Sequence, residues 1–152
     1  MPEKKKRLDT KLESEGAEFL VLGRLLLEKI VAYKAYINYP GYDLIAANTE
    51  KGTSARIQVK SRFHTNWEGF IIKSFDCDFV VVVALNRRFK HTKKNGDAGT
   101  REPEFYVFPI SYVIEIRDPK NNWGKINKSR MKEFEKYKSR WDLISSFLEG
   151  EK

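Results

Sequence analysis

The strongest constraint on the fold is an unbroken apolar run near the middle of the chain. Residues 79–85 have the sequence FVVVVAL, and polar residues bound the run on both sides. A strand with one face in water alternates apolar and polar residues, whereas a short run without alternation is typical of a strand buried on both faces. We therefore expect a strand that is buried on both faces, in a sheet that helices flank.

The segments around this strand supply its partners. Residues 35–63, AYINYPGYDLIAANTEKGTSARIQVKSRF, contain short β-prone runs separated by Pro40-Gly41 and by the polar stretch 48–54. These turn residues predict strand, turn, strand, loop and strand in succession. Residues 104–116, EFYVFPISYVIEI, predict a further strand that ends near Pro109. The predicted fold class is α/β, with a central mixed sheet of about five strands flanked by helices.

Two segments are expected to be helical. Residues 15–33, EGAEFLVLGRLLLEKIVAY, are rich in Leu, Val and Ile, as in a helix packed against a sheet. Its start is left open, because Thr10 with Glu13 could form a capping box and Ser14 is the alternative cap. In residues 127–150, apolar residues recur at spacings of three and four, which predicts a second helix with a stripe in the core. The stripe consists of Phe134, Tyr137, Trp141, Ile144 and Leu148.

Length and composition fit a single domain over residues 1–152. A chain of 152 residues can bury about 70% of its unfolded surface, and 41% hydrophobic residues suffice for a core. Cys77 is the single cysteine, so no internal disulfide can form, which fits a reducing compartment. The sequence contains no apolar run long enough for a membrane span, and no apolar segment follows the charged start. We therefore expect a cytoplasmic protein that does not enter membranes, with residues 1–9 as a flexible basic tail.

Lysine and arginine outnumber the acidic residues. Their excess, 29 against 21, gives a formal net charge of +8, and a basic domain of this kind typically binds an anionic partner, above all nucleic acid. A basic loop at residues 86–103 is longer than most connections, so it is a candidate for phosphate contacts; a solvated loop without a partner is the alternative. The candidate residues for DNA contact are Arg87, Arg88, Lys90, Lys93 and Lys94.

The hairpin predicted within residues 42–60 brings polar side chains together. Its connecting stretch is centred near Lys51, so Asp43 on the first strand lies across from Gln58 and Lys60 on the second. Gln58 and Lys60 are two residues apart and project to the same face. Burying a carboxylate, an amide and an ammonium without partners is costly, and a hard cation such as Mg²⁺, which takes oxygen ligands, is one reason to gather them.

This pattern resembles the PD-(D/E)xK nuclease superfamily, whose core is a helix followed by a strand hairpin carrying an acidic residue and then a (D/E)xK or QxK tripeptide. The matching segments are YDLIA, residues 42–46, and IQVKS, residues 57–61. In that family the helix adds a glutamate to the site. Glu18 is the residue that we match to it, with Glu15 as the competing assignment.

Two departures from the family pattern matter. Pro40 stands three positions before Asp43 rather than next to it. Gln58 stands where Asp or Glu is usual, which resembles the QxK variants of Mrr-like restriction enzymes and of some homing endonucleases. The amide removes one negative charge from the site, so cation binding depends on compensation by Glu18 or Glu15.

The resemblance implies a restriction-endonuclease-like core and a Mg²⁺- or Mn²⁺-dependent DNA endonuclease, a hydrolase of phosphodiester bonds. Its catalytic residues would be Glu18, Asp43, Gln58 and Lys60, with the first three also holding the cation and Lys60 assisting water and phosphate. A homodimer is a hypothesis that rests on the resemblance alone. The alternative function is a non-catalytic nucleic-acid-binding module of the same fold, in which Gln58 marks an eroded site.

Overall fold

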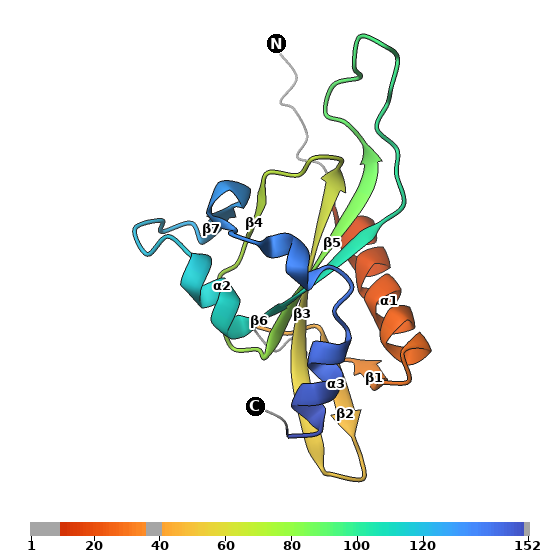
Figure 1. The fold of residues 1–152 in the computed structure, drawn as a ribbon, viewed down its shortest axis with the longest axis vertical. Coiled ribbons are helices and arrows are strands. Elements are labelled where there is room, and N and C mark those ends of the chain that lie inside the picture. Colours follow the sequence, from red (N-terminus) through yellow and green to blue (C-terminus); the bar gives the residue numbers. More distant parts are fainter. Residues whose placement is uncertain (1–9, 36–40, 151–152) are drawn as a thin grey trace, which may run out of the picture.

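The main sheet of the protein has five strands. The computed structural model describes residues 10–35 and 41–150, so the predicted basic tail and Pro40 lie outside the described residues. Within them the order of the main sheet is β1-β2-β3-β5-β6, and β4 and β7 form a second, two-stranded sheet (Figure 1). The strands are β1 (Val31–Lys34), β2 (Leu44–Asn48), β3 (Thr53–His64), β4 (Gly69–Ile71), β5 (Phe79–Arg88), β6 (Glu104–Pro109) and β7 (Lys125–Asn127).

The five-stranded sheet is mixed. Strands β1, β2 and β3 pair antiparallel, β3 and β5 pair in parallel, and β5 and β6 are antiparallel again. A parallel pair requires a crossover connection, and the segment that carries β4 provides it between β3 and β5. The predicted mixed sheet is thereby confirmed.

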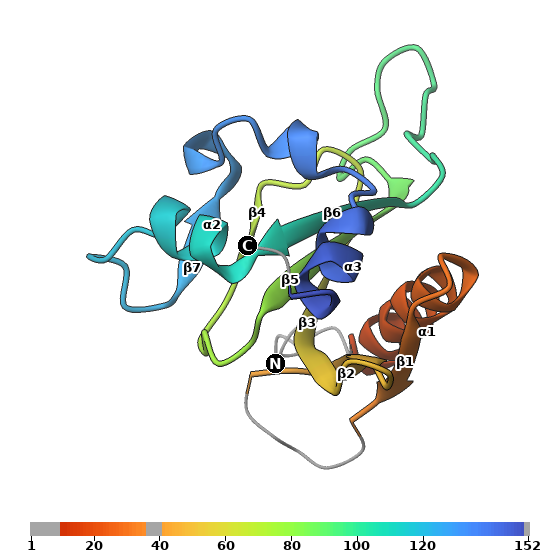
Figure 2. The ribbon, with the colours of Figure 1, turned by 60° about the horizontal axis from the view of Figure 1, so that its bottom comes forward.

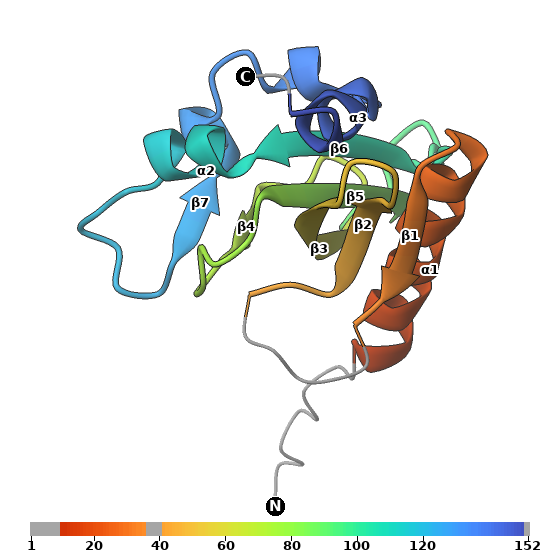
Figure 3. The same ribbon diagram turned by 90° about the horizontal axis from the view of Figure 1, so that it is seen from below.

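Both faces of the sheet are covered, which explains the unbroken apolar run. Helices α1 (Lys11–Leu27) and α3 (Asp142–Leu148) lie on one face, and α2 (Ile110–Ile116) lies with the small sheet on the other (Figure 3). Along β5, Val81 and Val83 pack with the residues of α1 and α3. The alternate residues Val80 and Val82 pack in the cluster on the second face. The predicted burial of this strand on both faces is confirmed.

The first helix ends earlier than its sequence predicts. It stops at Leu27, and residues 31–34 form β1, so the helix predicted over residues 15–33 is wrong in its last part. Lys29 adopts a left-handed conformation (φ 63°), and the Ile30 N–H donates to the Leu25 carbonyl 2.9 Å away. This is a Schellman ending, which usually uses glycine where Lys29 stands. At the other end Thr10 precedes the helix but makes no side-chain capping hydrogen bond.

The long C-terminal helix predicted over residues 127–150 is also wrong. The segment forms two single 3₁₀ turns, Lys128–Arg130 and Phe134–Tyr137, before the seven-residue α3. Left-handed conformations at Glu133 (φ 55°) and Ser139 (φ 53°) interrupt it. The Ser139 N–H donates to the Phe105 carbonyl at 2.7 Å, so the segment is tied to the edge strand β6.

The apolar stripe of this segment nevertheless packs into the core, as predicted, on two different faces. Trp141, Ile144 and Leu148 are buried with α1 on the first face. Phe134 and Tyr137 pack against the cluster on the second face. The chain therefore crosses the β6 edge between these two groups, which a single straight helix could not do.

Two short elements beyond these were not expected from the sequence. Strand β6 ends at Pro109, as predicted, but residues 110–116 form the short helix α2. The small sheet of β4 and β7 is not foreseen either, since each strand has three residues. In the part of the chain that the structure covers, no helix has the length and apolar character needed to cross a membrane.

Candidate active site

Asp43 lies at the fork where β2 separates from β3. Its backbone N–H donates to the Ile57 carbonyl at 2.8 Å, and its Oδ2 accepts a hydrogen bond from the Val59 N–H, also at 2.8 Å. The carboxylate oxygen thus accepts a hydrogen bond that a further residue of a paired strand would accept, because β2 no longer pairs with β3 beyond Ile57. The register of β2 and β3 places Asp43 beside the Gln58–Lys60 part of the hairpin, as the sequence predicts.

Gln58 is buried, and both hydrogens of its amide are engaged. Its Nε2 donates to the Gly41 carbonyl at 3.0 Å and to the Ser74 carbonyl at 3.1 Å. Gly41 has φ +109°, and a Cβ there would come within 2.7 Å of the Asp76 carbonyl oxygen, so this approach requires glycine. The amide is therefore held with its Oε1 as the atom left to accept a hydrogen bond or bind a cation.

Glu18 on α1 and Lys60 on β3 complete the group. A cavity of about 340 Å³ is lined by Ser14, Glu18, Gly41, Tyr42, Asp43, Gln58, Val59, Lys60 and Ser61. The structure therefore brings together Glu18, Asp43, Gln58 and Lys60, which the sequence analysis selects. Glu15, the competing assignment, has a half-exposed side chain and is not among the residues lining this cavity.

The two carboxyl groups in the cavity are both desolvated. Burial, followed by the negative charge of Asp43, raises the pKa of Glu18 to about 7. Burial also raises the pKa of Asp43, against the opposing effects of the Val59 N–H and of the positive charges of Lys60 and Lys34. Two carboxylates in such a place repel each other, and this repulsion favours either a bound proton or a cation.

The pKa of Lys60 is shifted in the opposite direction to the pKa values of the two carboxyl groups. Burial lowers the pKa of its ammonium group, and the positive charge of Lys73 adds to this effect, while Asp43 opposes it. Asp43 and Lys60 therefore have pKa values that are moved towards each other. A lysine whose pKa is lowered in this way can transfer a proton more readily than an exposed one.

Lys34 is a residue of the site region that the sequence analysis missed. It ends β1, its side chain is buried, it forms an ion pair with Glu15, and its Nζ lies 3.9 Å from a Glu18 carboxylate oxygen. The ammonium also lies 4.2 Å from the centre of the Phe19 ring. The sequence predicts a helix up to residue 33, and Lys34 can be placed beside α1 only if residues 31–34 are recognised as a strand.

The donor set of the cavity fits a hard cation. Glu18 and Asp43 offer carboxylate oxygens, and Gln58 offers a neutral amide oxygen. Among residues 10–35 and 41–150, no three His, Cys, Asp or Glu side chains form a metal-binding group, so this site has two carboxylates and not three. Mg²⁺ is commonly held by one or two carboxylates while it keeps several waters, which suits such a set better than a site closed by protein ligands.

The basic loop lies apart from this cavity. Arg87 and Arg88 end β5, and the loop carrying Lys90, Lys93 and Lys94 projects beyond that end (Figures 1 and 2). All five of these basic residues are exposed, and none lines the cavity of Asp43. Lys93 lies 4.7 Å from the Phe89 ring centre and borders a separate cavity of about 630 Å³.

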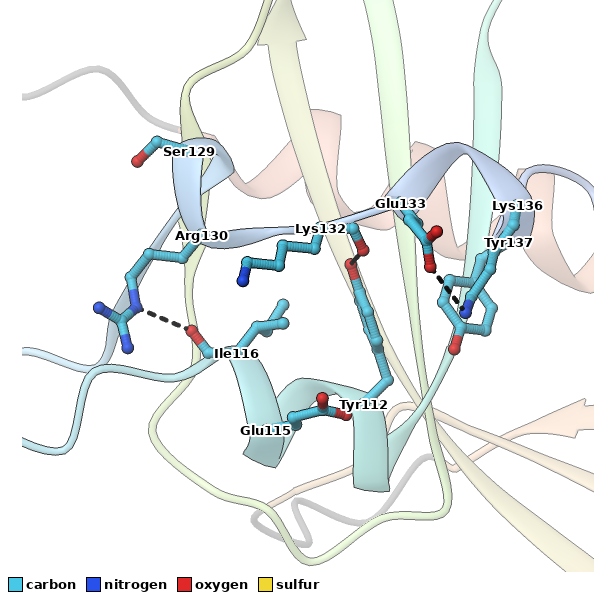
Figure 4. Close-up of a pocket in the computed structure, with 9 residues that line it drawn as sticks. All are labelled: Tyr112, Glu115, Ile116, Ser129, Arg130, Lys132, Glu133, Lys136 and Tyr137. Atoms are coloured by element: carbon cyan, nitrogen blue, oxygen red, sulfur yellow. Dashed lines mark hydrogen bonds and ion pairs between the residues drawn. The ribbon is translucent and has the colours of Figure 1, made fainter.

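Another cavity, of about 900 Å³, lies between α2 and residues 129–137 (Figure 4). Tyr112 donates to the Lys132 carbonyl at 2.9 Å, and Arg130 donates to the Ile116 carbonyl at 3.2 Å, so these contacts tie the two walls together. The acidic residues of its lining, Glu115 and Glu133, are exposed. This cavity offers no desolvated carboxyl pair, and the fork of β2 and β3 remains the candidate active site.

The five-stranded mixed sheet and the helices α1, α2 and α3 form an α/β fold. One protein with this fold is a bacterial homing endonuclease of known structure, with a TM-score of 0.58, 20% identical residues, and coverage of 93% of this chain and 96% of that chain. A weaker similarity, with a TM-score of 0.48, 14% identity and coverage of 92% and 98%, is to the Holliday junction resolvase Hjc of the archaeal hyperthermophile Archaeoglobus fulgidus. Neither a family model nor a curated protein sequence matches the chain. The homing endonuclease therefore establishes the fold class.

Proposed function

We propose that this protein is a Mg²⁺- or Mn²⁺-dependent DNA endonuclease that hydrolyses phosphodiester bonds. The observation that carries the proposal is the single cavity that Glu18, Asp43, Gln58 and Lys60 line together. Glu18 comes from α1, Asp43 immediately precedes β2, and Gln58 and Lys60 come from β3. The fold shared with a homing endonuclease supports it, as does the resemblance of Asp43 and the Gln58-Val59-Lys60 tripeptide to the PD-(D/E)xK pattern in its QxK form.

In this proposal Glu18, Asp43 and the Oε1 of Gln58 hold the cation. The ion would polarise the phosphate oxygens and compensate the two desolvated carboxylates. Asp43 is suited to anchor it, because the Val59 N–H fixes one carboxylate oxygen and leaves the other available. Gln58 is suited to a ligand role, because two carbonyl acceptors fix the orientation of its amide.

Lys60 acts on the water and the phosphate. Its ammonium would orient the attacking water and neutralise the charge that develops on the phosphate in the transition state. Burial lowers its pKa, so it gives up a proton at lower cost than an exposed lysine. The negative charge of Asp43 opposes this lowering of the pKa and favours the charged ammonium.

DNA is the proposed substrate because of the charge of the whole chain and the chemistry of the site. A net charge of +8 attracts a polyanion, and the site residues are those expected for phosphodiester hydrolysis. Lysines of the basic loop, Lys90, Lys93 and Lys94, would contact phosphates at a distance from the cavity. Such contacts position DNA without reading its sequence.

The test is cleavage of supercoiled, linear and branched DNA with Mg²⁺ or Mn²⁺. The native chain should cut, and Asp43→Ala and Lys60→Ala should each lower the rate by about a hundredfold or more. Glu115→Ala, which removes an exposed carboxylate of the large cavity, should leave the rate unchanged. Failure of the native protein to cut any of the substrates, with salt-sensitive DNA binding intact in all four proteins, would instead support a non-catalytic nucleic-acid-binding module.

A further inference from the structure

The outward face of α1 is apolar and largely exposed. The helix buries Ala17, Val21 and Leu25 against the sheet. On its other side, large side chains are between 41% and 89% exposed, namely Leu12, Phe19, Leu20, Leu26 and Leu27. Phe19, at the border of this side, contacts the Lys34 ammonium at the end of β1. The helix α1 forms the margin of the molecule in Figures 1 and 3. Contiguous apolar surface of this kind is uncommon on a monomer and marks an interaction site.

Two helical glycines lie within the same face. A Cβ added at Gly16 or Gly23 would meet nothing within 4 Å, so neither glycine is required by a neighbouring group of the described chain. Neither has a positive φ, and a glycine inside a helix costs about 0.5–1 kcal/mol relative to alanine. Their position is explained if the backbone of another helix approaches this face closely.

The residues of this face have the same arrangement when the helix is read in either direction. If two copies of α1 lie antiparallel with a two-fold axis midway between Phe19 and Leu20, Gly16 of one copy faces Gly23 of the other. Leu12 then faces Leu27, and Phe19 faces Leu20. A two-fold axis requires this reciprocity, because each contact must occur twice with the partners exchanged.

The charges beside the apolar face follow the same symmetry. Glu13 lies in the first turn and Arg24 in the last turn, about three turns apart, so both lie on one flank of the helix. In the antiparallel arrangement Glu13 of one copy lies near Arg24 of the other, and the reverse pair forms as well. Opposite charges thus meet at both ends, and the two helix dipoles also oppose each other favourably.

We infer that α1 is a homodimer interface, in which a second copy of this chain packs its own α1 antiparallel across the face of Leu12, Gly16, Phe19, Gly23 and Leu27. A single helix pair buries less than a standard interface, so the dimer is expected to be weak and to depend on concentration. The inference does not depend on nuclease activity. If both hold, the dimer joins two candidate active sites, because α1 also carries Glu18.

Sedimentation velocity over a wide range of protein concentration tests the interface. The native chain should pass from monomer to dimer as its concentration rises. Leu27→Glu, at a side chain that is 74% exposed, should weaken dimerisation by about tenfold or more while leaving the thermal unfolding of the monomer unchanged. Ile114→Glu, at an exposed apolar residue of α2, is the matched control and should dimerise like the native chain.

A charge exchange tests the antiparallel orientation. Glu13→Arg alone or Arg24→Glu alone should weaken the dimer, and the double variant should restore it, because both intermolecular pairs are then re-formed with reversed sign. A native chain that stays monomeric at every concentration would overturn the proposal. So would a dimer that Leu27→Glu leaves intact, or a double variant as weak as the two single variants.

Discussion

At the scale of single residues, the state of Glu18 couples the candidate site to pH. Its pKa is raised from 4.5 to about 7, first by burial and then by Asp43, so the folded chain binds this proton more tightly than the unfolded chain. The stabilisation is complete below pH 4.5 and is lost as the pH rises to about 7. Glu18→Gln should therefore be more stable than the native chain above pH 7, by about 1 kcal/mol after solvent screening, and nearly equal to it below pH 4.5.

Urea denaturation in the presence of EDTA, at one pH on each side of this window, checks the prediction. The difference in the free energy of unfolding between the two proteins isolates the contribution of Glu18 from that of other groups. A difference that does not change with pH would show that the carboxyl titrates in the folded chain as it does in the unfolded chain.

Lys34 provides a second test among the residues of the site region. Lys34→Met removes the buried ammonium that pairs with Glu15 and lies near Glu18, which should lower the free energy of unfolding by about 2 kcal/mol. Adding Glu18→Gln should recover part of this loss, because a neutral amide then replaces the Glu18 carboxylate, which has lost the neighbouring Lys34 ammonium. Thermal and urea unfolding measure both steps, and Lys125→Met, at an exposed lysine, serves as the control. Strictly additive effects of the two substitutions on the free energy of unfolding would show that Lys34 and Glu18 are not coupled.

The candidate site could be predicted from sequence only as far as local periodicity extends. Asp43, Gln58 and Lys60 follow from the two-residue repeat of a strand and the centre of one hairpin. Glu15 and Glu18 could not be separated, because a spacing of three places both on neighbouring parts of the helix surface. Lys34 could not be found at all, since its place beside α1 depends on where the helix ends.

At the scale of elements, the small sheet depends on a glycine at a close backbone approach. Gly69 in β4 has φ +151°, and an added Cβ would collide with the Ile126 carbonyl oxygen on β7. Gly69→Ala should therefore lower the free energy of unfolding by about 3 kcal/mol or more. Gly52→Ala, which has φ +65° but open space around it, should cost about 1 kcal/mol, the strain of the backbone conformation.

Urea unfolding of the two variants side by side separates collision from backbone strain. Equal losses would mean that β4 and β7 adjust without cost and that their pairing contributes little to stability. A larger loss in Gly69→Ala is the expected result.

The sequence could predict those elements whose residue pattern follows directly from their own burial. The β5 run is unbroken because both faces of the strand are covered. The end of α1 could not be predicted, because Lys29 occupies the left-handed position where glycine is the usual marker. The C-terminal segment has helical spacing, yet contacts with β6 on the sheet edge decide its path, and such contacts are invisible to local periodicity.

At the scale of the whole molecule, the net charge of +8 predicts DNA binding that weakens steeply with salt. If the basic loop contacts phosphates, replacing Lys93 and Lys94 by glutamine should weaken binding to every DNA sequence alike. It should also reduce the slope of log affinity against log salt by about one for each phosphate that is no longer neutralised. Fluorescence anisotropy over a salt series measures this slope. Replacement of Lys120 and Lys125, which are exposed on the α2 side, is the control, and an equal effect there would assign binding to net charge rather than to the loop.

The proposed function as a whole depends on whether Asp43 anchors a divalent cation. Titration of Mn²⁺ followed by electron paramagnetic resonance measures this directly, in the absence of DNA. The native chain and Glu115→Gln should bind Mn²⁺ alike, and Asp43→Asn should lose this binding while its circular dichroism spectrum stays native. Equal binding by the native chain and Asp43→Asn, or no binding by either, would contradict the assignment of the cavity between α1 and β3 as a cation-dependent active site.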